Sequence, residues 1–288
     1  MLRCRPVDTS DLKGAYAHCR QLAFGHYENF PVASLLLPQP QRDAIAAIYA
    51  FARQADDFAD EPAFAKDRVK LLQDWMGRLN RAPKDPVFMA LQDSIKAYKL
   101  PKALLADLVK AFLQDCRQAR YKNFEEVLAY CKLSADPVGR LVLRVFGTDT
   151  VEACAQSDAI CTALQLANHW QDLASDVQTR DRFYLPQDEL KRFGVREVDL
   201  KAGKFTPGMV ELMRLQVDRA EALFTLGEPL PAALGGRLGL EIRLTLLGGR
   251  RILHKIRRQA YDTLQARPKV GAWDAGVIVL KALRGRPA

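Results

Sequence analysis

The segment ICTALQLANHWQDLASDVQTRDRFYLP, residues 160–186, decides the expected fold. Asn168, Asp172 and Asp176 recur within it at a spacing of four residues. Because an α-helix turns about 100° per residue, side chains four residues apart lie on nearly the same face. Apolar neighbours flank these oxygen-bearing side chains, so the helix is expected to be partly buried. The segment therefore predicts one long helix over about 150–177, with a polar stripe that faces an enclosed space.

The rest of the chain shows the same helical periodicity, and alternating β-branched runs are nearly absent. Short turns between the expected helices suit antiparallel neighbours. There is no repeat of fixed period and no long linker, so residues 1–288 are expected to form a single all-α domain. Further helices are expected over 10–24, 41–60, 65–80, 86–98, 102–119, 124–132, 137–146, 209–227 and 242–260, with a short one after Pro186 and a last segment after Pro268.

Composition excludes several classes of protein. No apolar run approaches the roughly 20 residues that cross a bilayer, because Asp274 and Lys281 interrupt the most apolar segment near the carboxyl end. The amino-terminal residues include acidic side chains where a signal peptide has an apolar core, and the six cysteines form no Cys-x-x-Cys pair. We therefore expect a cytoplasmic protein with reduced thiols.

The positive charge is concentrated near the carboxyl end. Residues 237–286 carry twelve Lys or Arg against three acidic residues, which accounts for the whole formal charge (12 − 3 = +9). In the helix expected over 242–260, apolar side chains share one face and six cations lie elsewhere. A solvated basic face is one interpretation, and peripheral contact with anionic lipid on the inner face of the membrane is the other. No nucleic-acid partner is expected, because no known binding motif accompanies the charge.

A second acidic cluster ends the helix expected over 41–60. Its sequence is RQADDFADE, in which Asp56 and Asp60 lie one turn apart and Asp57 and Glu61 form another pair. The carboxyl end of a helix already carries partial negative charge, so these anions are costly unless a cation compensates them. A solvated helix end is the alternative to a metal site.

The two clusters together favour a magnesium site. Two helices with paired aspartates can face each other across the interior of a helical bundle. Carboxylate and amide oxygens suit Mg²⁺, which commonly bridges protein carboxylates to substrate phosphates. A di-iron bundle would require Glu-x-x-His, which is absent, and no Walker loop or dinucleotide fingerprint occurs. Arg53 and Arg182 are placed to complete a phosphate clamp. The predicted metal ligands are Asp56, Asp57, Asp60, Asn168, Asp172 and Asp176.

The motifs resemble those of the squalene/phytoene synthase family of head-to-head prenyl synthases, over roughly 16–264. YAFARQADDFAD at 49–60 looks like the first aspartate-rich motif of that family, and NHWQDLASDVQTRDRFYLP at 168–186 looks like the second. YCKLSADPVG at 130–139 matches the helix-breaking segment between them. The resemblance implies an isoprenoid-synthase helical bundle with a central apolar cavity, in which Mg²⁺ binds a diphosphate that ionises to leave a carbocation.

Three segments are similar to the bacterial hydroxysqualene synthases, a branch of this family that serves squalene and hopanoid biosynthesis: HYENFPVASLLLP at 26–38, SADPVGR at 134–140 and NHWQD at 168–172. Those enzymes release diphosphate from presqualene diphosphate while water captures the cation, and they use no nicotinamide cofactor. The resemblance implies catalytic roles for Arg53, Tyr130, Arg182 and Tyr184, and substrate contacts for His26, Asn29, Phe30, Tyr49, Trp170 and Gln171.

The carbocation would need a dry and partly aromatic wall. Each candidate also suits plain core packing. The candidates are Phe30, Tyr49, Phe51, Tyr130, Trp170 and Tyr184.

The chain departs from the family pattern at a few positions. Ser175 stands where a Glu is usual, Gln171 replaces a common Arg, and Glu28 replaces a basic or small polar residue. These departures weaken the case for condensation of two allylic diphosphates. Asp136 also stands where the hydroxysqualene synthases would have Asn. The alternatives are a presqualene diphosphate or phytoene-type synthase that joins two prenyl diphosphates, and a non-catalytic assembly protein of the same fold, which would be expected to lose metal ligands that this chain keeps.

Overall fold

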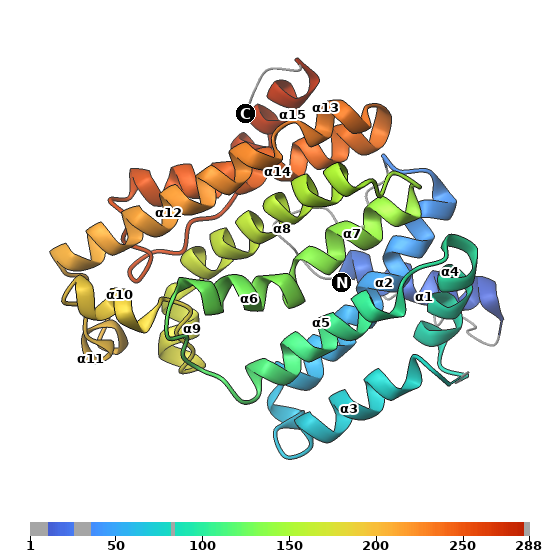
Figure 1. The fold of residues 1–288 in the computed structure, drawn as a ribbon, viewed down its shortest axis with the longest axis horizontal. Helices are drawn as coiled ribbons and strands as arrows, with labels where there is room; N and C mark the ends of the chain where they lie inside the picture. The colour runs from blue at the N-terminus through green and yellow to red at the C-terminus, as the bar shows by residue number, and fades with distance from the viewer. Residues whose placement is uncertain (1–10, 26–35, 82–83, 285–288) are drawn as a thin grey trace. The chain divides into compact units, whose positions relative to one another are not determined.

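The computed structural model describes residues 11–25, 36–81 and 84–284. Over this part of the chain the all-α prediction is confirmed, because the only extended pairing is an isolated parallel bridge between Arg120 and Phe183. The helices, shown in Figure 1, are α1 (Leu12–Gly25), α2 (Gln39–Asp60), α3 (Arg68–Arg78), α4 (Pro86–Tyr98), α5 (Lys102–Asp115), α6 (Phe124–Ser134), α7 (Asp136–Val145), α8 (Val151–Gln171), α9 (Leu173–Thr179), α10 (Gln187–Arg192), α11 (Glu197–Lys201), α12 (Pro207–Gly227), α13 (Leu230–Leu234), α14 (Gly236–Arg258) and α15 (Ala272–Leu283), with a 3₁₀ turn at Pro62–Phe64.

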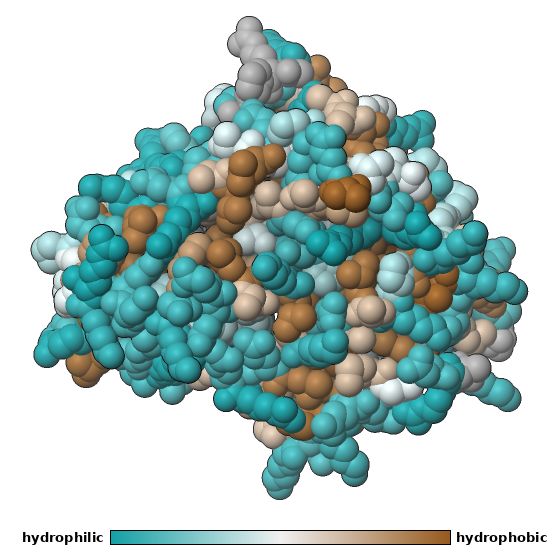
Figure 2. All heavy atoms as spheres, in the orientation of Figure 1, coloured by the Kyte–Doolittle hydropathy of each residue, from teal (hydrophilic) through white to brown (hydrophobic). Residues whose placement is uncertain are grey.

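The contacts divide the chain into two compact units. Unit 1 comprises the described residues of 1–116 and 140–149, and unit 2 those of 117–139 and 150–288. The first aspartate-rich motif belongs to unit 1 and the second to unit 2. On the face drawn in Figure 2, hydrophilic side chains cover most of the surface, with hydrophobic groups between them.

Unit 1 is organised around α2, which contacts α1, α3, α4 and α5. Its buried face includes Phe51, whose ring stacks on Trp75 at a centroid distance of 5.8 Å. The Trp75 indole also donates a hydrogen bond of 3.1 Å to the Phe51 carbonyl. Phe51 is thus ordinary core within this unit. The helix ends at Asp60 because Pro62 favours an extended conformation at Glu61, which has φ −69° and ψ 133°.

Unit 2 is built on α8, against which α12 and α14 pack (Figure 1). The Thr150 hydroxyl caps α8 by accepting a hydrogen bond of 3.1 Å from the Ala153 N–H, as its position in the sequence predicts. The expected uninterrupted helix over 150–177 is wrong at one point: Asp172 leaves helical geometry (φ −98°, ψ 11°) and separates α8 from α9. The Asp172 N–H still donates to the Asn168 carbonyl (2.8 Å), so helical hydrogen bonding continues to Asp172 and the break is a kink.

The cations of α14 have partners inside unit 2. Arg250 pairs with Glu221 and Glu228, and Arg257 with Asp218 and Glu221. Arg251 and Lys255 both pair with Asp274 of α15, while Arg243 donates to the Ala282 carbonyl. Much of the charge that the sequence places on this helix therefore holds neighbouring helices, and its predicted contact with lipid stays a prediction. None of the described helices is long and apolar enough to cross a membrane.

Close approach of α14 to its neighbours requires a glycine. A Cβ atom on Gly249 would lie 2.4 Å from Cζ of Phe224 in α12 and 2.8 Å from Cδ2 of Leu164 in α8. We expect Gly249→Ala to lower the free energy of unfolding by about 1–3 kcal/mol, because both neighbours are packed. Gly276→Ala is the matched control: nothing lies within 4 Å of its Cβ position, so added helix propensity should raise stability by about 0.5–1 kcal/mol. Urea unfolding of both variants checks this, and equal stability losses would contradict it.

The buried carboxylate that fastens α15 should make stability depend on pH. Burial alone would raise the pKa of Asp274, but hydrogen bonds from Lys255, the Gly271 N–H and Arg251 hold that pKa well below its usual range. Asp274 therefore contributes stability above a pH of about 4 and loses that contribution as the pH falls further. We expect Asp274→Asn to cost about 1.5–3 kcal/mol at pH 7 and progressively less below pH 4.

Urea unfolding at several pH values measures the difference. Asp218→Asn is the control, because this exposed aspartate pairs with Arg257 at the surface and should change stability by less than about 1 kcal/mol. A cost for Asp274→Asn that does not change with pH would contradict the assignment.

Candidate functional site

The first aspartate-rich motif lies in the last turns of α2. Arg53 pairs there with Asp56 (Nη1 to Oδ2, 3.2 Å) and with Asp57 (Nη2 to Oδ1, 2.8 Å). These three side chains and Asp60 are each half-buried. The guanidinium supplies the compensating charge that the sequence requires at this helix end, so Arg53 lies among the carboxylates it was predicted to accompany.

The electrostatics of this cluster show strain between like charges. Burial, followed by the neighbouring Asp60 carboxylate, raises the pKa of Asp56 to about 7, although Arg53 acts in the opposite direction. A carboxylate in this state gains from any cation that approaches it. The cluster therefore has the character of a cation-binding site.

The second motif surrounds the kink between α8 and α9. Both carboxylate oxygens of Asp172 accept hydrogen bonds from the Arg267 guanidinium, the one from Nη2 at 3.1 Å. Asp176 is buried and pairs with Arg180 at 3.3 Å. Burial is the main cause that raises the pKa of Asp176 to about 7, with Asp172 adding to it and Arg180 opposing it. Asn168, one turn before Asp172, is half-buried.

The chemistry of these donors fits a hard divalent cation. Each motif presents carboxylate oxygens in a partly buried setting with repulsion that a cation would relieve, and Asn168 adds an amide oxygen. Among the described residues, no three His, Cys, Asp or Glu side chains are already arranged as a metal-binding group. Arginines pair with the carboxylates of each motif instead.

Aromatic rings cluster beside the second motif in unit 2. The His169 ring stacks on Tyr184 at a centroid distance of 3.6 Å, and Tyr184 lies 5.5 Å from Tyr130 and 5.6 Å from Tyr121. Burial, with a smaller contribution from the Arg182 charge, lowers the pKa of His169 to about 3, so its imidazole is neutral. The predicted catalytic residues Tyr130 and Tyr184 are thus brought together in a buried aromatic group.

The predicted substrate-binding residues have different surroundings. Trp170 is fully buried. Gln171 is also buried, and its amide donates a hydrogen bond of 2.6 Å to the Pro268 carbonyl, which fastens a distant segment to α8. Tyr49 is half-buried on α2, one turn before Arg53. Their substrate contacts remain predictions. His26, Asn29 and Phe30 lie outside the described residues, as does Glu28.

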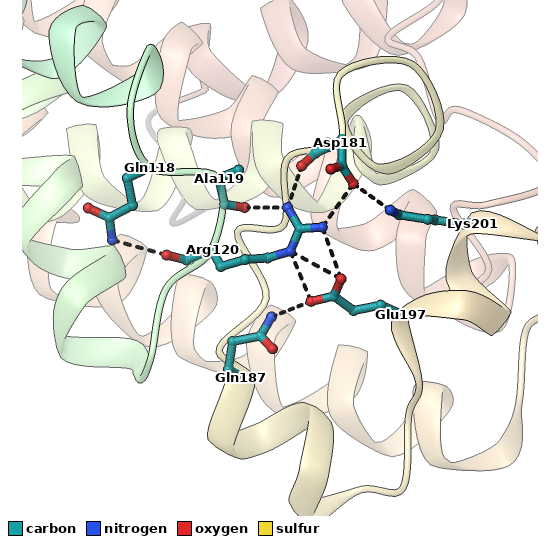
Figure 3. A network of polar contacts seen from close by, with 7 residues as sticks. All are labelled: Gln118, Ala119, Arg120, Asp181, Gln187, Glu197 and Lys201. Atoms are coloured by element: carbon teal, nitrogen blue, oxygen red, sulfur yellow. Dashed lines mark hydrogen bonds and ion pairs between the residues drawn. The ribbon is translucent and has the colours of Figure 1, made fainter.

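A network of polar contacts holds the segment that carries Arg182 and Tyr184 (Figure 3). Arg120 donates to the Asp181 carbonyl (2.5 Å) and carboxylate (2.8 Å), and forms paired hydrogen bonds with Glu197 (2.9 Å each). Lys201 pairs with the same Asp181 carboxylate at 2.7 Å. Hydrogen bonds from Lys201 and then Arg120 lower the pKa of Asp181.

Contacts also fix the backbone of this segment. Asp181 adopts the left-handed region with φ 53°, a conformation that costs energy in a residue other than glycine. The Phe183 N–H donates to the Ala119 carbonyl (2.9 Å), and the Arg120 guanidinium lies over the Phe183 ring at 4.0 Å. Phe183 stands between Arg182 and Tyr184 in the chain. The network therefore fixes the backbone position of both predicted catalytic residues.

Sequence reasoning missed Arg120, Glu197 and Arg267. Arg120 and Arg267 lie far along the chain from the motif residues they bind, and neither belongs to a recognisable pattern. Tyr121, which joins the aromatic group, carried no periodic signal either. Only tertiary structure brings these side chains to the motif.

Comparisons with known proteins identify the family of the chain. A family model described as squalene/phytoene synthase matches residues 24–274. A hydroxysqualene synthase from Rhodopseudomonas palustris is 36% identical over 83% of this chain and 82% of its own length. A phytoene synthase from Arthrospira platensis is 31% identical over 93% of this chain and 91% of its own. The crystal structure of a squalene synthase from Alicyclobacillus acidocaldarius has a TM-score of 0.82 at 42% identity, and covers 87% of this chain and 96% of its own.

Loss of the Arg120 network should loosen the segment around Phe183. We expect Arg120→Lys to speed amide hydrogen exchange at Phe183, Gln187 and Asp188, whose N–H groups bond carbonyls of 119–122, by about tenfold. Lysine cannot reproduce the paired contacts of the guanidinium. Exchange in α12 should not change.

Arg214→Lys is the matched control. Arg214 also forms an ion pair, with Glu211, and its guanidinium lies 5.8 Å from the centroid of the Tyr261 ring, but it is at the surface. Hydrogen exchange read by mass spectrometry distinguishes the two. Unchanged protection at Phe183 in Arg120→Lys would contradict the positioning role of the network.

Proposed function

The chain belongs to the squalene/phytoene synthase family, and from that premise we propose that this enzyme is a hydroxysqualene synthase. Its substrates would be presqualene diphosphate and water, and its products hydroxysqualene and diphosphate. The observation that carries the proposal is the relative of that name, 36% identical over 83% of the chain, together with both aspartate motifs intact. Identity to the phytoene synthase is lower, at 31%.

We propose that both motifs act on the same diphosphate within one domain of residues 1–288, around the central apolar cavity that the family resemblance implies. Asp56, Asp57 and Asp60 of the first motif and Asn168, Asp172 and Asp176 of the second would hold Mg²⁺. When bound, Mg²⁺ would act as a Lewis acid that stabilises negative charge on the leaving diphosphate. The raised pKa of Asp56 and of Asp176 supports this role, because both carboxylates need a neighbouring cation.

Two arginines accompany these carboxylates. Arg53 lies between Asp56 and Asp57, and the Arg182 N–H bonds the Asp176 carbonyl at 2.9 Å. We propose that both guanidinium groups donate to diphosphate oxygens, where their fixed charge would stabilise the leaving group. Arg182 depends for its position on the segment held by Arg120.

The cation left behind needs an environment that excludes bulk water. The rings of Tyr130, Trp170 and Tyr184 are buried, and their π faces can stabilise positive charge. Trp170 and Tyr184 belong to the second motif, and Tyr130 lies against Tyr184. The neutral His169 beside Tyr184 adds no positive charge to this group. We therefore propose that this aromatic group forms part of the cavity wall, with a single water admitted to capture the cation.

The unusual residues of the second motif support release of one diphosphate rather than condensation of two. Ser175 is exposed, and its carbonyl accepts a hydrogen bond of 2.5 Å from the Thr179 hydroxyl. Its own hydroxyl is neutral and adds no charge to the motif. Gln171 is engaged with the Pro268 carbonyl. The second motif thus lacks a carboxylate and a guanidinium that phosphate and metal binding would use elsewhere in the family. A presqualene diphosphate or phytoene-type synthase is the remaining alternative.

We further propose that the enzyme works at a membrane surface, since hydroxysqualene is insoluble in water. The basic helix α14 was the predicted contact, but many of its cations pair inside unit 2.

Incubation of the purified enzyme with presqualene diphosphate and Mg²⁺ tests the activity. We expect hydroxysqualene whose hydroxyl oxygen derives from labelled water, loss of turnover with a chelator, and recovery on addition of Mg²⁺. Asp56→Ala and Asp172→Ala should each lower kcat/KM by about 100-fold or more, because each removes a ligand carboxylate. Mass spectrometry of the product and its oxygen label measures all of these.

Asp107→Ala and Asp218→Ala are the matched controls, because both aspartates pair with cations and neither belongs to a motif. Each should retain full turnover. Conversion of farnesyl diphosphate alone into a longer diphosphate would support the condensing alternative. Full activity in both motif variants would contradict the assignment of the metal ligands.

A further inference from the structure

The outward face of α15 is apolar. Trp273, Val279, Leu280 and Leu283 have 81%, 47%, 49% and 69% of their surfaces exposed. At about 100° per residue these four side chains share one side of the helix, together with Ala272 and Gly276. Exposed single apolar residues are ordinary, but a helix face made of them is not.

The orientation of α15 is fixed by its other face. Asp274, Ile278 and Ala282 are buried, and Ile278 and Ala282 pack against Leu247 of α14. Ion pairs from Arg251 and Lys255 to Asp274 fasten the first turn, and Arg243 holds the last through the Ala282 carbonyl (3.2 Å). Rotation that would bury Trp273 and Leu280 would expose the Asp274 carboxylate and break these bonds. The apolar face is therefore kept outward.

The exposed charged residues within 263–284 are all cations. Lys269, Lys281 and Arg284 are exposed, and the only acidic residue between 263 and 284 is the buried Asp274. At the edge of α14, burial and then Arg251, Arg258, Arg257 and Lys281 lower the pKa of His254, which reflects a positive local field. A partner for this surface would combine an apolar interior with negative charge at its edge.

We propose that α15 lies in the headgroup layer of an anionic lipid bilayer, with Trp273, Leu280 and Leu283 inserted among the acyl chains and Lys281 and Arg284 on the phosphates. Tryptophan favours this layer, where its ring is apolar and its N–H is wet. With 12 residues α15 is too short to span a bilayer, which takes roughly 20, and suits a helix in the plane of the membrane.

This contact is distinct from the catalytic motifs. The match to the family model ends at residue 274, so all but the first turn of α15 lies beyond it. Two cations of the basic helix, Arg251 and Lys255, anchor α15 through Asp274. These two cations would thus support lipid binding indirectly, because they hold α15 in the orientation that exposes its apolar face.

Fluorescence of the full chain tests the proposal directly. The three tryptophans are Trp75, Trp170 and Trp273, of which the first two are 4% and 0% exposed. A change on contact with lipid therefore reports Trp273. We expect vesicles of phosphatidylcholine with phosphatidylglycerol to shift the emission to the blue, and brominated acyl chains to quench it. Pure phosphatidylcholine vesicles should do so about tenfold less effectively at equal lipid.

Variants separate the apolar and the charged contributions. Leu280→Ser combined with Leu283→Ser should weaken co-sedimentation with anionic vesicles by about tenfold or more. Val151→Ser combined with Val198→Ser is the matched control, since these side chains are 91% and 63% exposed on other helices. Lys281→Glu combined with Arg284→Glu should abolish the preference for anionic lipid, whereas Lys122→Glu with Lys132→Glu should keep it.

Three outcomes would overturn the proposal. Emission from Trp273 that anionic vesicles neither shift nor quench would exclude insertion. Equal vesicle recovery for the leucine variants and the valine control would place the contact elsewhere. A dimer in sedimentation velocity that the leucine variants dissociate, without vesicle binding by the parent chain, would assign the face to a second copy of the chain. Circular dichroism and turnover of presqualene diphosphate, both expected to be unchanged, show that each variant is folded.

Discussion

Carboxylates placed within one helical turn of each other, at helix ends that are partly buried, are the constraint on which the site depends. Burial and mutual repulsion both disfavour the charged forms, and both act on Asp56 and Asp176. The protein offsets this repulsion with arginines. In the first motif the arginine is local, three residues before Asp56. In the second motif the local Arg180 pairs with Asp176, and Arg267 reaches Asp172 from 95 residues further along the chain.

In the second motif, aspartates are bound by arginines that lie far away in the sequence. Arg267 binds Asp172 and the neighbouring Pro268 carbonyl binds Gln171, so one segment is fastened to the end of α8 by two contacts. On the other side Arg120 holds Asp181. The first attachment holds the kink at Asp172 itself, and the second holds the segment that follows α9. Contacts from Arg120, Arg267 and Pro268 thereby help to fix the backbone that carries the motif side chains, which is how surrounding residues support a site.

The fold and the motifs were largely predictable because their signals are local. Helical periodicity located most helices, and the spacing of the aspartates identified both acidic clusters. The kink at Asp172 was not predicted, because no proline or glycine marks it in the sequence, and the Arg267 that binds Asp172 is brought there by tertiary structure. Arg120 and Glu197 were missed for the same reason: a charged side chain without a periodic neighbour looks like surface in a sequence. His26, Asn29 and Phe30, which are predicted to contact substrate, lie outside the described part of the chain.

The charge near the carboxyl end shows what composition alone leaves out, namely which cations are paired within the fold. A run of arginines on one helix suggests a basic surface, yet four of these cations face carboxylates of neighbouring helices. Paired charges of this kind give little net attraction to an anionic partner. Arg251 and Lys255 hold α15 through Asp274, whereas Arg250 and Arg257 pair with acidic residues in or directly after α12. An enzyme whose product dissolves in lipid gains more from an apolar contact that brings it to the bilayer than from unspecific charge, since burial of apolar surface is not screened by salt.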